Sequence, residues 1–266
     1  MSSMTVLVLG SGGREHALAL ACHRDPEVAA VHVAPGNPGT ASFATNHPLD
    51  PCDCDAVVSL ARGLEADLVV VGPEAPLVAG VADALRESGI DCFGPSAEAA
   101  QLEGSKAFAK EVMAAARVPT AASRSCDDAN SVSAALDEFG PPYVVKDDGL
   151  AGGKGVVVTH DRAEALAHAK RCFESDHRVV VEEYLDGPEV SLFAICDGTR
   201  ALPMQPAQDF KRVGNGGVGP NTGGMGAYTP LPWAPDDLVE TVSTTIISPT
   251  LRAMADRGTP FVGLLY

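Results

Sequence analysis

Residues 144–158, VVKDDGLAGGKGVVV, place a glycine-rich loop with two lysines between two runs of valine. Glycine with lysine is typical of phosphate binding, because exposed backbone N–H groups approach phosphate oxygens and lysine adds charge. The Walker pattern G-x-x-x-x-G-K-[ST] fails, since Asp148 stands at its first glycine and Gly155 at its Ser/Thr position. A Walker loop also joins a strand to a helix, whereas this loop joins two strands. The stretch therefore predicts a hairpin flap over phosphate; an ordinary glycine hairpin is the alternative.

The segments around this hairpin predict an α/β fold in two parts. Strands alternate with helices in the first hundred residues, which implies a parallel sheet covered on both faces. These strands are expected at 4–9, 28–34, 66–72 and 90–94, and the helices at 14–24 and 76–89. A helical stretch at 96–118, broken at Gly104 and Ser105, leads into a mixed α+β part. Its elements are expected as helices 127–139, 161–175 and 235–257 and strands 143–147, 156–159, 179–185 and 189–196.

Composition narrows the function classes. The chain has 266 residues, of which 45% are apolar and 20% charged, as in an ordinary globular protein. Its net charge of 19 − 35 = −16 repels phosphate backbones and anionic lipid, so neither nucleic acid nor membrane is expected as a partner. The apolar stretches are too short to span a bilayer, and no basic residue precedes Arg14 as a secretory signal would require. Seven scattered cysteines, with one weak C-x-C at 52–54, predict reduced thiols and a cytoplasmic protein.

Lysine is rare in this chain and gathers at the candidate sites. Of the 19 basic residues, 13 are arginine and six are lysine. Four of the lysines, at 106, 146, 154 and 211, lie in or beside glycine-containing stretches. Because lysine binds phosphate as a compact point charge, this pattern favours an anionic ligand, although chance clustering is the alternative for so few residues.

A glycine turn, GSGGREH at 10–16, follows the first strand and opens the first helix. The dinucleotide fingerprint G-x-G-x-x-G requires glycine where Glu15 stands, and the second strand ends in VAPGNPG without an acidic residue for the ribose. A nicotinamide dehydrogenase is therefore disfavoured. A phosphate or small polar substrate at the helix N-terminus is the functional interpretation, and a packing turn is the alternative. Glu74 follows a buried strand, either at the ligand-binding edge of the sheet or as a helix-start carboxylate.

Three later stretches add to this picture. VVVEEYLDGPEVSL, at 179–192, ends a strand in carboxylates and an aromatic residue, which suits a purine base and its ribose; a solvated strand end is the alternative. DFKRVGNGGVGPNTGGMGAYTP, at 209–230, has the polar side chains and glycines of a loop that closes on an anionic substrate; a linker is the alternative. The chain stops in TPFVGLLY, an apolar strand, so we expect it to be truncated.

Taken in order, seven motifs resemble the glycinamide ribonucleotide synthetase (phosphoribosylamine–glycine ligase) family of ATP-grasp ligases. They are LVLGSGGREHALA, VAPGNPGTA, VVGPEAPLVAGVAD, FGPSAEAAQLEGSKAFAK, VVKDDGLAGGKGV, VVVEEYLDGPEVSL and KRVGNGGVGPNTGGMGAYTP. The resemblance implies ATP-dependent ligation of glycine to 5-phosphoribosylamine through glycyl phosphate, in purine biosynthesis, with Mg²⁺ or Mn²⁺. It also implies a Rossmann-like pre-ATP-grasp substrate domain at 1–103 and an incomplete ATP-grasp region at 104–266. Within that region, 119–188 would be a lid subdomain and 189–266 the start of the larger subdomain.

The resemblance assigns roles to residues of this sequence. The catalytic residues would be Lys106, Lys146, Lys154 and Arg212. The ATP-binding residues would be Lys106, Lys146, Gly149, Gly152, Gly153, Lys154, Gly155, Glu182, Glu183, Tyr184, Leu185 and Glu189. The substrate-binding residues would be Gly10, Gly12, Gly13, Arg14, Glu74, Asp209, Lys211, Asn221, Thr222, Gly223, Gly224 and Met225.

Two features depart from the family pattern. A small residue is usual where Asp147 stands; strand alternation would place this carboxylate on the opposite face from Lys146, whereas a carboxylate facing the site would oppose a triphosphate. The family's metal ligands are expected beyond residue 266, so no metal ligand is assigned. An inactive or partial ATP-binding fragment is therefore an alternative. Another ATP-grasp ligase, such as a biotin-carboxylase-like enzyme, is a second alternative, against which the GPNTGGMGAY loop argues.

Overall fold

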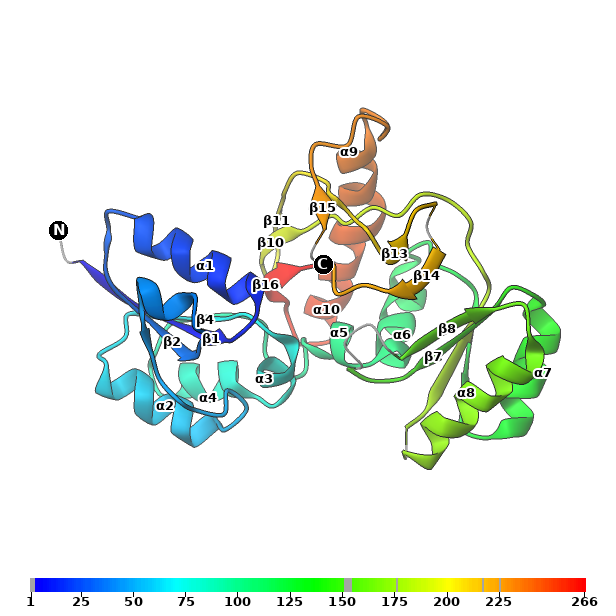
Figure 1. The fold of residues 1–266 in the computed structure, drawn as a ribbon, viewed down its shortest axis with the longest axis horizontal. Coiled ribbons are helices and arrows are strands. Elements are labelled where there is room, and N and C mark those ends of the chain that lie inside the picture. The colour runs from blue at the N-terminus through cyan, green and yellow to red at the C-terminus, as the bar shows by residue number, and fades with distance from the viewer. Residues whose placement is uncertain (1–2, 151–154, 176, 217, 225) are drawn as a thin grey trace. The chain divides into compact units, whose positions relative to one another are not determined.

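The computed structural model describes residues 3–150, 155–175, 177–216, 218–224 and 226–266 (Figure 1). The chain divides into two compact units, and each is described by itself. Unit 1 comprises the chain up to Gln101 together with Cys196–Gly198 and Gly258–Leu265. Unit 2 comprises Leu102–Ile195, Thr199–Arg257 and Tyr266.

Unit 1 is built on the parallel sheet that the sequence predicts. Its five strands pair in the order β3-β2-β1-β4-β5 and are all parallel. The strands are β1 (Met4–Gly10), β2 (Val28–Pro35), β3 (Thr45–Asn46), β4 (Leu68–Val71) and β5 (Cys92–Phe93). The helices are α1 (Gly13–Arg24), α2 (Cys54–Gly63), α3 (Glu74–Val78) and α4 (Val81–Glu87), with a short 3₁₀ turn η1 (Thr40–Ser42).

Alternation along β1 explains why helices cover both faces of this sheet. Leu7 and Leu9 are fully buried in a core shared with residues of α2 and α4. Val6 and Val8 point the other way, into a second core that includes Ala19 of α1. A strand buried on both faces reads as a continuous apolar run, as MTVLVLG does. Figure 1 shows α1 on one side of the sheet and α2 with α4 on the other.

Two helical predictions for unit 1 were incomplete. The expected helix at 76–89 is two helices, because Ala79 and Gly80 end α3 and Gly80 adopts a positive φ of 94°. Helix α2 was not predicted, although Asp53 caps it by accepting a hydrogen bond from Ala56 N at 3.0 Å. Its signal was an N-cap aspartate before an amphipathic stretch, which the neighbouring cysteines and acidic residues obscured.

Unit 2 contains the four-stranded antiparallel sheet that carries the hairpin. Its order is β6-β9-β7-β8, formed by β6 (Ser123–Cys126), β7 (Tyr143–Asp147), β8 (Val156–Thr159) and β9 (Val179–Glu182). The helices α7 (Ala129–Phe139) and α8 (Arg162–Glu174) bury Val145, Val179 and Val181 of the sheet beneath them. Strand alternation therefore leaves Val144, Lys146, Val180 and Glu182 on the opposite face.

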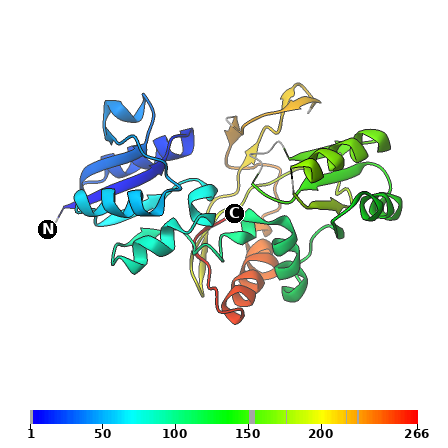
Figure 2. The same ribbon diagram turned by 90° about the horizontal axis from the view of Figure 1, so that it is seen from below.

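Two helices precede this sheet, and one of them packs on a later helix. Helix α5 (Gln101–Gly104) ends at the predicted break, and α6 (Lys106–Ala116) begins after Ser105. Helix α10 (Ser248–Asp256) lies beside α6 (Figure 2), where the Arg257 guanidinium stacks 4.9 Å from the centre of the Phe108 ring. This contact anchors the helix that carries Lys106.

The last predicted helix is interrupted, and two of the predicted strands are shorter than expected. The expected helix 235–257 is α9 (Leu238–Val242), a π-helical stretch η2 (Ser243–Ile247) and α10. Pro249 lacks the N–H that an α-helical ladder requires, and the hydroxyls of Ser243 and Thr245 bond carbonyls four residues back, so both disturb the helix locally. The expected strands 179–185 and 189–196 shorten to β9 and β10 (Ala194–Asp197).

The segment predicted as a long loop contains short antiparallel pairs. Strand β12 (Gln208–Asp209) pairs with β15 (Ala227–Tyr228), and β13 (Arg212–Gly214) pairs with β14 (Val218–Asn221). A further three-stranded sheet has the order β11-β10-β16, with β11 at Ala201–Pro203 and β16 at Val262–Leu265. The two antiparallel pairs, β12 with β15 and β13 with β14, give the glycine-rich segment a defined path.

Candidate functional site

A buried carboxylate between two lysines forms the centre of the candidate site in unit 2. Lys146 Nζ donates to Glu182 Oε2 at 2.8 Å, and Lys110 Nζ lies 3.4 Å from Glu182 Oε1. Only 8% of the Glu182 side chain is exposed. Register explains the first contact: Glu182 is directly opposite Val144, so Lys146 is its diagonal neighbour on the same sheet face. The cluster of Lys110, Lys146 and Glu182 carries one net positive charge in a strongly acidic chain.

The end of β7 is joined to the start of α6. Asp148 accepts hydrogen bonds from Ser105 Oγ and Ala107 N, both at 3.1 Å, at the N-terminus of the helix. Ser105 is the N-cap residue, and its hydroxyl accepts from Phe108 N at 3.1 Å. Lys106 Nζ donates to the carbonyl of Gly149 at 2.8 Å. Two predicted residues, Lys106 and Gly149, are therefore in direct contact where the hairpin loop begins.

The predicted hairpin is confirmed in its two strands. β7 and β8 pair antiparallel from Tyr143 opposite Thr159 to Lys146 opposite Val156, and Asp147 N donates to Gly155 O at 2.7 Å. The flap residues Gly152, Gly153 and Lys154 lie outside the described residues.

Asp147 faces away from the lysine cluster, as strand alternation predicted. Its carboxylate accepts from His177 Nδ1 at 2.9 Å and 3.0 Å, on the side of the sheet that α8 covers. His168 of α8 lies 3.2 Å from the carbonyl of Gly155, with Nε2 as the closest atom. Two histidines therefore contact the two ends of the hairpin loop.

The predicted adenine segment begins at Glu182 and leaves the sheet. Glu183 is paired with Ala122 through both its backbone and its carboxylate, which accepts from Ala122 N at 2.8 Å. Tyr184 and Leu185 are exposed, at 45% and 63%. Exposed apolar side chains directly after a buried charged cluster offer a surface on which a flat base can pack.

The segment after β12 brings three more predicted residues together. Lys211 Nζ lies 3.1 Å from Asp209 Oδ2 and 3.9 Å from Glu189 Oε2. Burial lowers the pKa of Lys211, but the hydrogen bond to Asp209 and the negative charges of Glu189 and Asp209 outweigh it, so the pKa is raised above its ordinary value. Lys211 is therefore a fully charged lysine at neutral pH.

The remaining predicted residues of this segment form turn contacts. Arg212 donates to the carbonyl of Gly219 at 2.9 Å, and Thr222 Oγ1 donates to the carbonyl of Phe210. Gly224 has a φ of +71° and donates its N–H to Thr222 Oγ1 at 3.1 Å, and Gly223 lies between them. Met225 lies outside the described residues, as does the side chain of Asn221.

In unit 1 the side chain of Glu15 fills the glycine turn at residues 10–16. The Glu15 carboxylate accepts from Gly12 N at 2.7 Å, and Glu15 is only 3% exposed. A Cβ at Gly10 would lie 2.4 Å from Glu15 Cγ, and one at Gly72 would lie 2.3 Å from Glu15 Oε1. Glycine is therefore required at these positions to make room for Glu15. The residue that breaks the dinucleotide fingerprint occupies the anion position at the start of α1, which explains why that fingerprint fails here.

Arg14 pairs with Glu74, another predicted substrate residue, and with Glu15. Its Nε donates to Glu15 Oε1 at 2.6 Å and its Nη1 to Glu74 Oε1 at 2.7 Å. Arg14 and Glu74 are 48% and 40% exposed. The guanidinium is thus held in a fixed orientation by two carboxylates while part of it faces solvent. Gly13 is the first residue of α1 beside this arginine.

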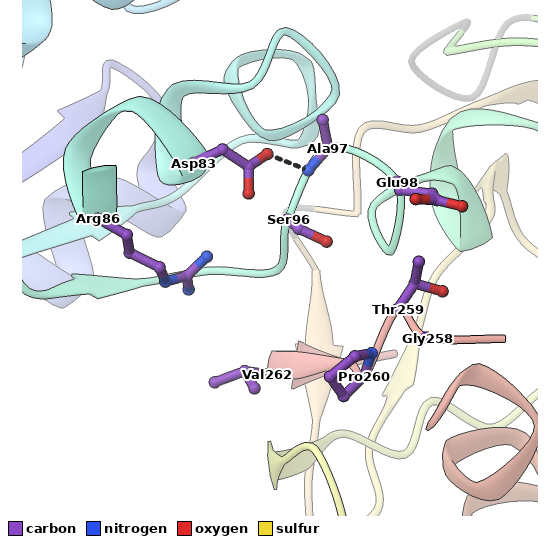
Figure 3. Close-up of a pocket in the computed structure, with 9 residues that line it drawn as sticks. All are labelled: Asp83, Arg86, Ser96, Ala97, Glu98, Gly258, Thr259, Pro260 and Val262. Atoms are coloured by element: carbon purple, nitrogen blue, oxygen red, sulfur yellow. Dashed lines mark hydrogen bonds between the residues drawn. The ribbon is translucent and has the colours of Figure 1, made fainter. Parts of the chain in front are cut away.

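Unit 1 also has an open hollow of about 590 Å³ that none of the predicted residues line. Figure 3 shows its wall, in which Asp83 accepts a hydrogen bond from Ala97 N at 2.7 Å. Arg86 donates to the carbonyls of Cys92 and Gly94. These two charged groups of α4 hold β5 and the segment that follows it, and this structural role accounts for both.

Sequence reasoning missed Lys110 and Asp148. Lys110 lies one helical turn after Lys106, and this i, i+4 spacing was the available signal. Asp148 follows β7 directly, and its role as a second cap for α6 depends on a contact 41 residues away in the chain. Spacing within a helix is readable from sequence, whereas pairing between a helix and a distant strand is not.

Among the described residues, no three histidine, cysteine, aspartate or glutamate side chains converge as metal ligands. Nor does any helix in the described ranges combine the length and apolar character needed to cross a membrane.

A parallel α/β unit joined to a hairpin-bearing antiparallel unit with a lysine–carboxylate cluster defines an ATP-grasp class of protein. The chain belongs to the phosphoribosylglycinamide synthetase family. Residues 4–103 match the N domain of that family and residues 104–266 match its ATP-grasp (A) domain. The family expected from the seven motifs is thereby confirmed.

Known relatives agree with this assignment. The chain is 63% identical over 263 residues to a phosphoribosylamine–glycine ligase of Streptomyces coelicolor, covering 99% of the chain but 62% of the relative. A crystal structure of phosphoribosylamine–glycine ligase from Thermotoga maritima superimposes with a TM-score of 0.83 at 30% identity, covering 98% of the chain and 63% of that structure. The chain therefore spans less than two thirds of the length of these relatives.

The fold is shared more widely than the sequence. The biotin carboxylase domain of Hydrogenobacter thermophilus 2-oxoglutarate carboxylase, solved with ADP, has a TM-score of 0.76 at 16% identity and covers 99% of this chain and 60% of that one. At this identity the likeness concerns the fold alone.

Proposed function

We propose that this chain takes part in the ATP-dependent ligation of glycine to 5-phosphoribosylamine, giving glycinamide ribonucleotide, ADP and phosphate. The observation that carries the proposal is the buried cluster of Lys110, Lys146 and Glu182 beside the hairpin, directly before the exposed Tyr184 and Leu185. A cationic cluster next to an apolar surface suits a nucleotide, which has an anionic end and a flat apolar end. The co-substrates, glycine and phosphoribosylamine, are inferred from the relatives, which are named phosphoribosylamine–glycine ligases.

The proposed chemistry proceeds in two steps. A glycine carboxylate oxygen attacks the γ-phosphorus of ATP, the bond to the β-phosphate oxygen breaks, and ADP leaves. The amine of phosphoribosylamine then attacks the carbonyl carbon of glycyl phosphate; phosphate leaves and the amine loses a proton. Phosphoryl transfer needs positioning and charge neutralisation, which fixed lysines provide. The hairpin loop would exclude water from the acyl phosphate.

The predicted site residues that the structure describes have proposed places in this scheme. Lys106 and Lys146 contact the phosphates, with Gly149 and Gly155 at the two ends of the flap. Glu182 to Leu185 receive the adenine, with Glu189 toward the ribose. The proposed phosphate-contacting lysines lie on α6 and β7, two elements that Asp148 joins directly.

The remaining described residues would bind the other substrates. Asp209, Lys211, Thr222, Gly223 and Gly224 surround an anionic or amino substrate, with Arg212 as a further cation. In unit 1, Gly10, Gly12, Gly13, Arg14 and Glu74 would bind a substrate. Because Glu15 occupies Gly12 N, an anion at this turn would depend on the exposed part of Arg14. The magnesium or manganese that the family resemblance implies finds no ligand set among the described residues, so no step is assigned to it.

The test is ATP binding by the wild-type chain and by Lys146→Met, measured by isothermal titration. Removing one charge-assisted phosphate contact should weaken binding by about 10- to 100-fold. Lys170→Met is the matched control, because Lys170 is 77% exposed and its nearest ion-pair partner is Glu174 at 3.8 Å. The control should bind ATP as the wild type does.

Turnover is then measured as phosphate release with ATP, glycine and phosphoribosylamine. Release that requires both co-substrates supports the ligase. Binding without turnover would favour a nucleotide-binding fragment. Equal ATP affinity for Lys146→Met and the wild type would show that the nucleotide does not bind at this cluster.

A further inference from the structure

Lys110 is the least exposed cation of the buried cluster and the one that no phosphate contact explains. Its side chain is 13% exposed, against 28% for Lys146. Lys110 Nζ lies 2.9 Å from Thr120 Oγ1, 2.8 Å from the carbonyl of Ala121 and 3.4 Å from Glu182 Oε1. An ammonium group has three N–H donors; two of them are used by Thr120 and Ala121, and Glu182 is its ion-pair partner.

Lys146 has a different situation on the same carboxylate. Within the described ranges, Glu182 is the acceptor that Lys146 Nζ bonds, at 2.8 Å, and the ammonium retains donor capacity and solvent access. If a phosphate drew Lys146 away, Glu182 would stay buried and charged. A buried carboxylate that loses its partner is strongly destabilising. A second, fixed cation removes this penalty.

We propose that Lys110 is a positioning residue: it remains on Glu182 as a permanent counter-charge, so that Lys146 can move from Glu182 to a nucleotide phosphate. This assignment rests on the proposed nucleotide site and adds a division of labour within it. Lys110 anchors the carboxylate and Lys146 serves the ligand.

The surroundings of Glu182 support this division. The charged groups that face it come from two elements, Lys110 of α6 and Lys146 of β7, while the neighbouring carboxylate of Glu183 is directed to Ala122 N. Burial lowers the pKa of Lys110, and the attraction of Glu182 opposes that shift. The ion pair with Glu182 thus favours the charged form of Lys110, and Glu182 keeps this partner whenever Lys146 leaves.

The experiment measures ATP affinity for Lys110→Met, Lys110→Arg and Thr120→Val. Lys110→Met should weaken ATP binding about tenfold, because Lys146 is then retained by Glu182. Lys110→Arg keeps the charge and should stay within about threefold of the wild type. Thr120→Val removes an anchor but no charge and should bind as the wild type does.

The decisive comparison uses Glu182→Gln as a second background. If Lys110 acts through Glu182, adding Lys110→Met to Glu182→Gln should cause no further loss of affinity, and this double variant also tests the idea if Lys110→Met alone does not fold. A loss that persists in the Glu182→Gln background, or failure of the double variant to fold where Glu182→Gln folds, would overturn the proposal. So would Lys110→Met binding as the wild type does, which leaves the nucleotide site intact. A wild-type chain that does not bind ATP would overturn the proposed function and the Lys110 assignment with it.

Discussion

At the scale of single residues, Asp147 shows how a strand separates opposing charges. Its neighbours in the chain, Lys146 and Asp148, face the candidate site and the start of α6, whereas the Asp147 carboxylate contacts His177 on the other face. The alternation of β7 is sufficient to keep a negative charge away from the proposed phosphates. A residue that departs from the family pattern is thus compatible with the proposed site.

Asp147→Asn should therefore leave ATP affinity within about twofold of the wild type. The variant should lose no more than about 1 kcal/mol of unfolding free energy, because His177 is half exposed and its contact is weakened by solvent. Titration with ATP and urea unfolding provide the two readouts. Asp137→Asn, which removes an exposed partner of Arg162, is the matched control. A large gain in ATP affinity would show that Asp147 faces the triphosphate.

In unit 1, Glu15 shows that a side chain can occupy the place of a bound anion. The sequence indicated that a dinucleotide turn fails at this position, and the structure gives the reason, since the Glu15 carboxylate fills the space that Gly10, Gly12 and Gly72 leave. The identity of the occupant was not predictable from the pattern. Three glycines around an anion position look the same in sequence whether the anion is a ligand or a side chain.

At the scale of elements, α6 connects the helix caps to the candidate site. Ser105 caps the helix, Asp148 adds a second acceptor from the end of β7, and Lys106 and Lys110 project from its first two turns. The helix begins where it does because a serine and a distant aspartate both accept its free N–H groups. Its position therefore depends on the strand that carries Lys146.

Ser105→Ala should lower the unfolding free energy by about 1–2 kcal/mol, because it removes the N-cap and the bond to Asp148. It should also weaken ATP binding, because the start of α6, which positions Lys106 and Lys110, is then held less firmly. Asp53→Ala removes the cap of α2, a helix with none of the predicted site residues, and should cost similar stability without changing affinity. Equal loss of affinity in the two variants would show that α6 has no special connection to the site.

Elements were predicted from sequence where one physical signal dominated. The buried strand β1 and the hairpin strands β7 and β8 were predicted within a residue, since runs of valine and leucine bounded by glycine have few other solutions. Errors arose where signals competed: Gly80 divides an apolar helical stretch, and Pro249 with a row of hydroxyl residues converts part of a helix to η2. Lys106, Lys146 and Glu182 were among the residues predicted from the sequence, whereas Lys110 was missed. The pairing of Glu182 with Lys110 and Lys146 became visible only once the register of β7 and β9 was known.

At the scale of the whole molecule, the thiols link folding to alkaline pH. All seven cysteines carry thiols, and burial is the first cause that raises the pKa of each. The pKa of Cys92 rises from 9.0 to about 11, with burial as the main cause, Arg86 opposing it and Asp83 adding to it. In the unfolded chain this thiol ionises first, so between these two values the folded state holds more protons.

The sign of the pH dependence follows from this order. A raised folded-state pKa stabilises the fold fully below the unfolded value, and the stabilisation is lost as pH rises through the folded value. Unfolding free energy should therefore fall between pH 9.0 and about 11, with Cys92 alone accounting for up to about 2 kcal/mol. Lys110 acts in the opposite direction, because its lowered pKa makes the unfolded chain bind more protons just below 10.5. A comparison between variants is needed to isolate one thiol.

Cys92→Ala provides that comparison in urea unfolding under reducing conditions. The substitution itself changes packing at every pH, so the readout is the change in unfolding free energy from about pH 8 to about pH 11, and not its absolute value. The variant should lose less stability over this range than the wild type, by up to the amount assigned to Cys92. Cys22→Ala is the matched control, since its thiol has a smaller upward shift and should leave the slope closer to that of the wild type. Parallel slopes for the wild type and Cys92→Ala would show that the Cys92 thiol is not held neutral by the fold.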